Sequence, residues 1–137
     1  MATAKPAPIW DNKPAKHDYP AAANYLSLLA DPKTVSDLVA SLKKAPIIVF
    51  KAKDILRASR LDLLGLDNEH VRADLIKVVQ GIKLSPVLLV RGDMLRDYPT
   101  TIADGYHRVC ASHHIDENTD IPCRIAELPV AEHVAHA

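Results

Sequence analysis

The chain has 137 residues, of which 48% are hydrophobic and 25% are charged, as is usual for a globular protein with one domain. Seventeen basic residues balance seventeen acidic ones, and this net charge of zero argues against a protein that coats DNA or an anionic membrane. No apolar run of about 18 residues occurs and no secretory signal is evident, so we expect a cytoplasmic protein with reduced cysteines.

The first 20 residues contain four prolines and no apolar periodicity, so we expect a mobile N-terminal arm over residues 1–20. Trp10 is the exception within this arm, and we expect it to dock on the domain itself rather than on a neighbouring subunit. Residues 21–128 are predicted to form a single domain, and residues 129–137 a C-terminal tail.

The first predicted elements are two helices and a strand. A short helix is expected over residues 21–30. Asp31 and Pro32 then suit a helix N-cap and the first helical position, and apolar residues at helical spacing predict a helix over residues 32–44. The apolar run at residues 47–50 predicts a buried strand.

The second half of the chain alternates helices and strands. Asp67 or Asn68 is expected to cap a helix that ends at Gly81. The inner face of this helix is predicted to consist of Val71, Leu75, Val78 and Val79. The elements expected after it are strand 86–91, strand 100–103, helix 104–114 and strand 121–126. We therefore predict an α/β (α+β) fold, with a small mixed sheet and flanking helices.

The stretch TIADGYHRVCASHH, at residues 101–114, carries the best candidate site. If Asp104 caps the helix, the next backbone amides point outward and the helix dipole favours an anion there. Gly105 would let that anion approach the backbone closely, and Arg108 and His107 would add cationic contacts. The pattern indicates a phosphate-binding helix start, and the alternative is an ordinary corner between a strand and a helix.

A metal site is the second interpretation of this stretch. His107, Cys110 and His114 follow at i, i+3 and i+7, and Asp116 and Cys123 come later. Paired ligand spacings of the kind that structural zinc sites use are missing, so no metal ligand is predicted. Cys110 is expected to be a packed thiol, and a bridge from it to Cys123 is the minor alternative.

Five segments together resemble the ParB/sulfiredoxin superfamily. They are IIVFKAKDIL, DNEHVRADLIKVVQG, SPVLLVRGD, TIADGYHRVCA and ENTDIPCRIAEL, and they cover residues 46–128. Residues 105–108, Gly-Tyr-His-Arg, stand where sulfiredoxins carry Gly-Cys-His-Arg and ParB proteins carry Gly-Glu-Arg-Arg. The resemblance implies that Gly105, Tyr106, His107 and Arg108 bind the phosphates of a nucleoside triphosphate, ATP or CTP, with Mg²⁺.

The chain also departs from the pattern of this superfamily. Tyr106 replaces the cysteine nucleophile of sulfiredoxins, which argues against sulfinic acid reduction. On the preceding helix, His70 and Ala73 replace a lysine and a serine that face the nucleotide, so Lys77 or Arg72 would have to supply the missing contacts. ParB proteins continue into a DNA-binding region for which this chain has no room, so we do not expect DNA to be a partner of this chain by itself.

Three functions follow from these patterns. The first is a stand-alone module that binds a nucleotide or a phosphorylated small molecule, for instance as a switch. The second is a phosphotransferase or nuclease in which Asp104 and His107 act as acid and base, with Asp54 or Asp67 as a second carboxylate. The third is a non-catalytic interaction protein, for instance a homodimer joined through the arm that carries Trp10.

Overall fold

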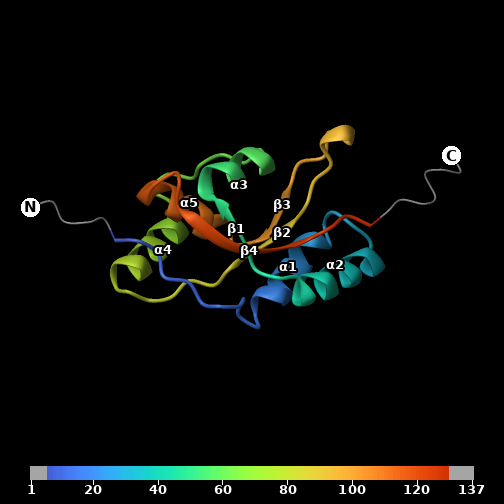
Figure 1. The fold of residues 1–137 in the computed structure, drawn as a ribbon, viewed down its shortest axis with the longest axis horizontal. Coiled ribbons are helices and arrows are strands. Elements are labelled where there is room, and N and C mark those ends of the chain that lie inside the picture. Colours follow the sequence, from blue (N-terminus) through green and yellow to red (C-terminus); the bar gives the residue numbers. More distant parts are fainter. Residues whose placement is uncertain (1–5, 130–137) are drawn as a thin grey trace, which may run out of the picture.

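The structure is a computed structural model that describes residues 6–129 of the chain. Four strands form one mixed sheet in the order β1-β4-β2-β3 (Figure 1). Strand β4 pairs antiparallel with β1 and parallel with β2, and β2 pairs antiparallel with β3. The strands are β1 Ile48–Lys51, β2 Val87–Val90, β3 Thr101–Asp104 and β4 Asp120–Ala126.

Helices cover both faces of this sheet, which confirms the predicted α+β class. Helices α1 and α2 lie together on one face, and α3, α4 and α5 lie on the other (Figure 1). Their bounds are α1 Asp18–Leu26, α2 Pro32–Lys44, α3 Ala52–Ser59, α4 Glu69–Val79 and α5 Tyr106–Ile115. A short 3-10 helix, η1, spans Met94–Arg96 in the connection between β2 and β3.

Alternation along the strands divides the core into two clusters. In β2, Val87 and Leu89 pack under α3, α4 and α5, whereas Leu88 and Val90 pack against α1 and α2. All four β2 residues are buried, because an inner strand with helices on both faces exposes neither side. The site described below lies at the end of β3, the strand next to β2.

Two helix starts agree with the sequence. The Asp31 side chain accepts a hydrogen bond from the Thr34 amide at 3.1 Å, and α2 spans the predicted residues 32–44. Asn68, rather than Asp67, caps α4 and accepts from the first-turn amides. Both starts could be predicted because a cap and its amide are neighbours in sequence.

Other predictions about local structure were wrong. The first helix begins at Asp18 and not at residue 21. Strand β1 is not buried: it is an edge strand in which Val49 is 54% exposed. In α4, Val71 and Val78 are buried as expected, but Val79 is 72% exposed because the helix turns it away from the sheet.

The N-terminal segment differs from the predicted arm within the described residues. Trp10 forms a parallel β-bridge with Leu84, and the Leu84 amide donates to the Ile9 carbonyl at 2.7 Å. The Trp10 ring packs against the core cluster under α3, α4 and α5, which agrees with the expectation that it docks on its own domain. Residues 1–5 and 130–137, which hold the rest of the predicted arm and most of the predicted tail, lie outside the described residues.

Between residues 6 and 129, the structure contains no helix with the length and apolar character needed to cross a membrane.

Candidate functional site

A cavity of about 210 Å³ lies between α4 and the start of α5. Its walls come from α4, from the end of β3 and from the first turn of α5, which pack together in the fold. The lining residues are His70, Ala73, Asp74, Lys77, Asp104, Gly105, His107 and Arg108. Most of the candidate site residues from the sequence thus meet around one cavity, although they come from two separate segments of the chain.

Among the candidate phosphate-binding residues, Tyr106 and Arg72 do not line this cavity. The Tyr106 hydroxyl donates to the carbonyl of Asp62, which holds the side chain against the preceding loop. Arg72 instead lines a shallow apolar depression on the other side of α4, together with Leu75 and Ile76. Lys77 and Arg72 were the two cations expected to supply the nucleotide contacts that His70 and Ala73 do not. Lys77 lines the cavity, and Arg72 does not.

The start of α5 differs from the predicted cap. Gly105, and not Asp104, occupies the N-cap position, with φ 111° and ψ 15°. A Cβ atom on Gly105 would lie 2.8 Å from Val87 Cγ2 and 2.9 Å from Arg108 Nη2, so there is no room for a side chain. No side chain caps this helix. The first-turn amides of α5 are therefore left for solvent or a ligand.

Arg108 lies between two carboxylates. Its Nη2 donates to Asp104 Oδ2 at 3.0 Å and to the carbonyl oxygen of Pro86 at 3.3 Å, and lies 3.8 Å from Asp18 Oδ2. The Asp18 side chain is 3% exposed and also accepts a hydrogen bond from the Ser85 hydroxyl. Because these partners surround the guanidinium, its position is fixed before any ligand arrives.

Burial dominates the protonation of the acidic groups in this cavity. It raises the pKa of Asp104, and the nearby Asp18 adds to this effect while Arg108 opposes it. Burial also raises the pKa of Asp74, against the opposing charges of Arg108 and Lys77. Both carboxyls are therefore easier to protonate than an exposed aspartate.

The two histidines form a pair at the edge of the cavity. The ring centroids of His70 and His107 lie 4.8 Å apart at an angle of 46°. Burial lowers the pKa of His107, and the proximity of His70 lowers it further. At neutral pH, His107 is therefore mostly uncharged and can accept a proton when an anion binds nearby.

Two residues of this site were missed by the sequence analysis. Asp74 lies between His70 and Lys77 on α4, and its Oδ1 lies 4.0 Å from Lys77 Nζ. Asp18 approaches Arg108 from the start of α1. Asp74 carried a local signal, because it lies four residues after His70 and three before Lys77, whereas nothing in the sequence connects Asp18 with Arg108.

The expected second carboxylates lie elsewhere. Asp54 is on α3, where its carboxylate is 3.6 Å from Arg57, and neither it nor Asp67 lines the cavity. Asp74 occupies the place that was expected for one of them.

The candidate metal ligands His107, Cys110 and His114 do not form a metal site in the described part of the chain. Within residues 6–129, no group of three or more His, Cys, Asp and Glu side chains is arranged to hold a metal ion. Cys110 is buried in the core, and His114 Nε2 lies 2.7 Å from the Leu64 carbonyl oxygen. Cys110 and Cys123 are free thiols. Burial raises the pKa of Cys110 and raises that of Cys123 to about 12. Neither thiol is therefore activated as a nucleophile.

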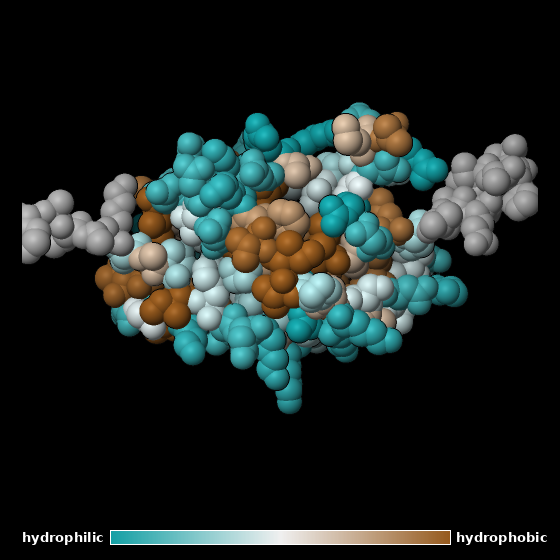
Figure 2. Space-filling model, viewed as in Figure 1, coloured by the Kyte–Doolittle hydropathy of each residue, from teal (hydrophilic) through white to brown (hydrophobic). Residues whose placement is uncertain are grey.

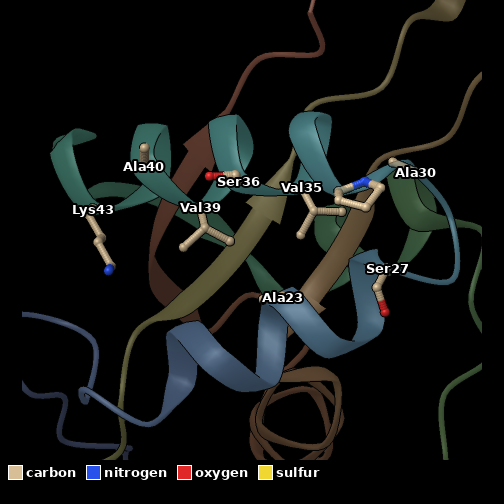
Figure 3. Close-up of a pocket in the computed structure, with 9 residues that line it drawn as sticks. Ala23, Ser27, Ala30, Val35, Ser36, Val39, Ala40 and Lys43 are labelled. Atoms are coloured by element: carbon tan, nitrogen blue, oxygen red, sulfur yellow. The ribbon is translucent and has the colours of Figure 1, made fainter.

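A larger cavity of about 550 Å³ lies between α1 and α2 and is unlike the first in chemistry. Small and apolar side chains line it, and Figure 3 shows Val35 and Val39 of α2 directed toward α1. Of the described residues that line it, Lys43 alone is charged. The described lining of this cavity is mostly apolar and contains none of the carboxylates and histidines that line the first.

Comparison of the chain with protein-family models, with curated proteins and with solved structures finds no match.

Proposed function

We propose that this chain binds the phosphate groups of a nucleotide, or of another phosphorylated small molecule, in the cavity between α4 and α5. The observation that carries the proposal is the convergence of His70, Lys77, His107 and Arg108 with an uncapped helix start on one cavity. Helix amides and cationic side chains together form a favourable environment for phosphate oxygens.

The size of the cavity limits what it encloses. At about 210 Å³ it is smaller than the roughly 300 Å³ at which pockets begin to enclose a drug-sized ligand. The phosphates would therefore lie inside and the nucleoside outside, against the exposed ends of His70 and Lys77. The resemblance to the ParB/sulfiredoxin superfamily makes ATP and CTP the first ligands to test.

The carboxylates around the cavity make Mg²⁺ a part of this proposal. Mg²⁺ is commonly held by one or two carboxylates together with the phosphates of a substrate, and Asp74 and Asp104 both line the cavity. When bound, the ion would neutralise charge on the phosphates. Without it, the ionised carboxylates would repel them, so we expect nucleotide binding to depend on Mg²⁺.

The test is a thermal-shift panel of ATP, CTP, GTP and inorganic phosphate, each with Mg²⁺ and with a chelator. A ligand at 100 times its dissociation constant stabilises the folded state by about 2.7 kcal/mol. Lys77→Gln should weaken binding about fivefold to tenfold, because one charge-assisted hydrogen bond is lost. Lys44→Gln, at the end of α2 and away from the cavity, is the matched control.

Stabilisation by a phosphate ligand that Lys77→Gln weakens and Lys44→Gln leaves unchanged would support the proposal. No shift with any ligand at millimolar concentration, or equal shifts in both variants, would contradict it.

A second candidate function is phosphoryl transfer or phosphodiester cleavage in the same cavity. It is favoured by two carboxyl groups beside His107, those of Asp74 and Asp104, whose pKa is raised by burial so that they take up a proton more easily than exposed aspartates. Asp74→Asn should then abolish turnover of a nucleotide, whereas binding should weaken but persist because Asp104 would still be available to Mg²⁺. Binding without any turnover in the wild-type protein would leave the binding module as the function.

A further inference from the structure

The outer edge of β1 is an open strand edge. Among residues 6–129, β1 occupies one end of the sheet and pairs only with β4, on its inner side. Its residues pair with those of β4 without a bulge, from Ile48 opposite Cys123 to Lys51 opposite Asp120. An edge of this kind presents unpaired backbone groups to another strand.

The register shows which backbone groups face outward. The Ala52 amide, directly after β1, donates to the Thr119 carbonyl at 2.9 Å, so the backbone N–H and C=O groups of Ala52 point toward β4. The direction of these backbone groups alternates along an antiparallel ladder. Those of Ile48 and Phe50 therefore also point toward β4, whereas those of Val49 and Lys51 point toward the open edge. Pro122, which has no N–H to donate, lies opposite Val49 and agrees with this pattern.

The side chains along this edge are apolar and accessible. Ile47 and Ile48 are each 37% exposed, and Val49 is 54% exposed. Figure 2 shows an apolar area near the middle of the face where Figure 1 places β1. Between Ile47 and Phe50 there is no charge, proline or bulge of the kind that usually protects an edge from pairing.

We propose that two copies of this chain associate by antiparallel pairing of β1 with β1, about a twofold axis at Val49. This register places Val49 opposite Val49 of the second copy, Ile48 opposite its Phe50, and Ile47 opposite its Lys51. The outward N–H and C=O groups of Val49 then pair with each other, and the two sheets become one continuous sheet.

Charge and length favour this register over its neighbours. Lys51, the charged residue of β1, lies opposite an isoleucine and keeps its contact with Asp120, at 3.5 Å within its own chain. A twofold axis at Lys51 would instead place two lysines opposite each other, which destabilises a strand pair. An axis at Ile47 would leave half of β1 unpaired. The edge lies apart from the cavity between α4 and α5, so this proposal does not depend on the proposed function.

The first experiment measures the mass of the full chain in solution by sedimentation velocity over a wide range of concentrations. The wild-type chain should form a dimer. Val49→Lys and Val49→Glu should each raise the dissociation constant of the dimer tenfold or more, because like charges would meet at the axis. An equimolar mixture of the two variants should restore dimers, since a lysine on one copy would then face a glutamate on the other. Val79→Lys changes another exposed valine, on α4, and should dimerise as the wild type does.

A second measurement needs no variant, so it remains decisive if a charge at position 49 prevents folding. In amide hydrogen exchange on the wild-type chain, Val49 and Lys51 should be protected only at concentrations at which the dimer forms, because these amides face away from β4. A wild-type monomer at every concentration would overturn the proposal. So would a dimer that Val49→Lys leaves intact, or exchange at Val49 that does not change with concentration.

Discussion

At the scale of single residues, the main feature of the site is that Arg108 is already paired. The sequence assigns this arginine to a phosphate, but in the structure Asp104 and Asp18 both lie within ion-pair distance of its guanidinium. The positive charge available to a ligand therefore comes mainly from Lys77 and the two histidines. Because burial lowers the pKa of His107, the protonation of this residue, and hence pH, is a determinant of anion affinity.

His107 should couple anion binding to proton uptake. Burial holds its pKa below the ordinary 6.5, so it is uncharged in the free protein at neutral pH. A bound anion favours the imidazolium and raises that pKa. The affinity for sulfate, measured by isothermal titration without Mg²⁺, should therefore rise about threefold to tenfold from about pH 7.5 to about pH 5.5. Sulfate is the probe because its own charge stays constant over this range.

The control for this experiment separates His107 from the other ionisable side chains that line the cavity, which are His70, Asp74, Lys77, Asp104 and Arg108. His107→Gln should remove most of the pH dependence, and the part that remains should come from Asp74 and Asp104, whose pKa is raised by burial. His113→Gln, on α5 but outside the cavity, should behave as the wild type does. An unchanged pH profile in His107→Gln would contradict this assignment.

At the scale of elements, the geometry of the site depends on the tight junction between β3 and α5. Gly105→Ala should lower the free energy of unfolding by about 1–2 kcal/mol for the left-handed backbone, and by a further ~1–3 kcal/mol for displaced neighbours. The displaced groups would be Val87 and the Arg108 guanidinium, which both approach the added carbon more closely than real Cβ contacts allow. Urea denaturation followed by circular dichroism measures the loss.

Gly81→Ala is the matched comparison for that junction. Gly81 also has a positive φ, 72°, but no atom lies within 4 Å of an added Cβ. Its substitution should therefore cost only the backbone component, about 1–2 kcal/mol. Equal losses in the two variants would show that the space around Gly105 is not a constraint.

The elements also show which features were predictable from the sequence. The caps of α2 and α4 depend on neighbouring residues, so the sequence located the first at Asp31 and narrowed the second to Asp67 or Asn68. The exposure of β1 could not be predicted, because an apolar run has the same sequence in an edge strand as in a central one. The partnership of Arg108 with Asp18 depends on how α1 packs against β3, and no local pattern encodes it.

At the scale of the whole molecule, the two faces of the sheet are stabilised by different parts of the chain. The cluster on one face is covered by α1 and α2, which are neighbours in sequence. The cluster under α3, α4 and α5 also receives Trp10, from a segment that the proline content had marked as mobile. Composition describes the average tendency of that segment, whereas the packing of Trp10 and the backbone hydrogen bonds of Ile9 and Asp11 with Leu84 hold it on the domain.

Trp10→Ala should therefore destabilise the whole domain and not merely free its first residues. Because Trp10 is partly exposed, we expect a loss of about 2–3 kcal/mol in the free energy of unfolding, somewhat less than for a fully buried tryptophan. Trp10→Phe should recover most of this loss, since an aromatic ring would still cover the core. Trp10 is the single tryptophan of the chain, so unfolding has to be followed by circular dichroism rather than by tryptophan fluorescence. The expected result is a single cooperative transition shifted to lower urea concentration. A loss below about 0.5 kcal/mol, the range of ordinary surface substitutions, would show that the Trp10 side chain contributes little to the stability of the fold.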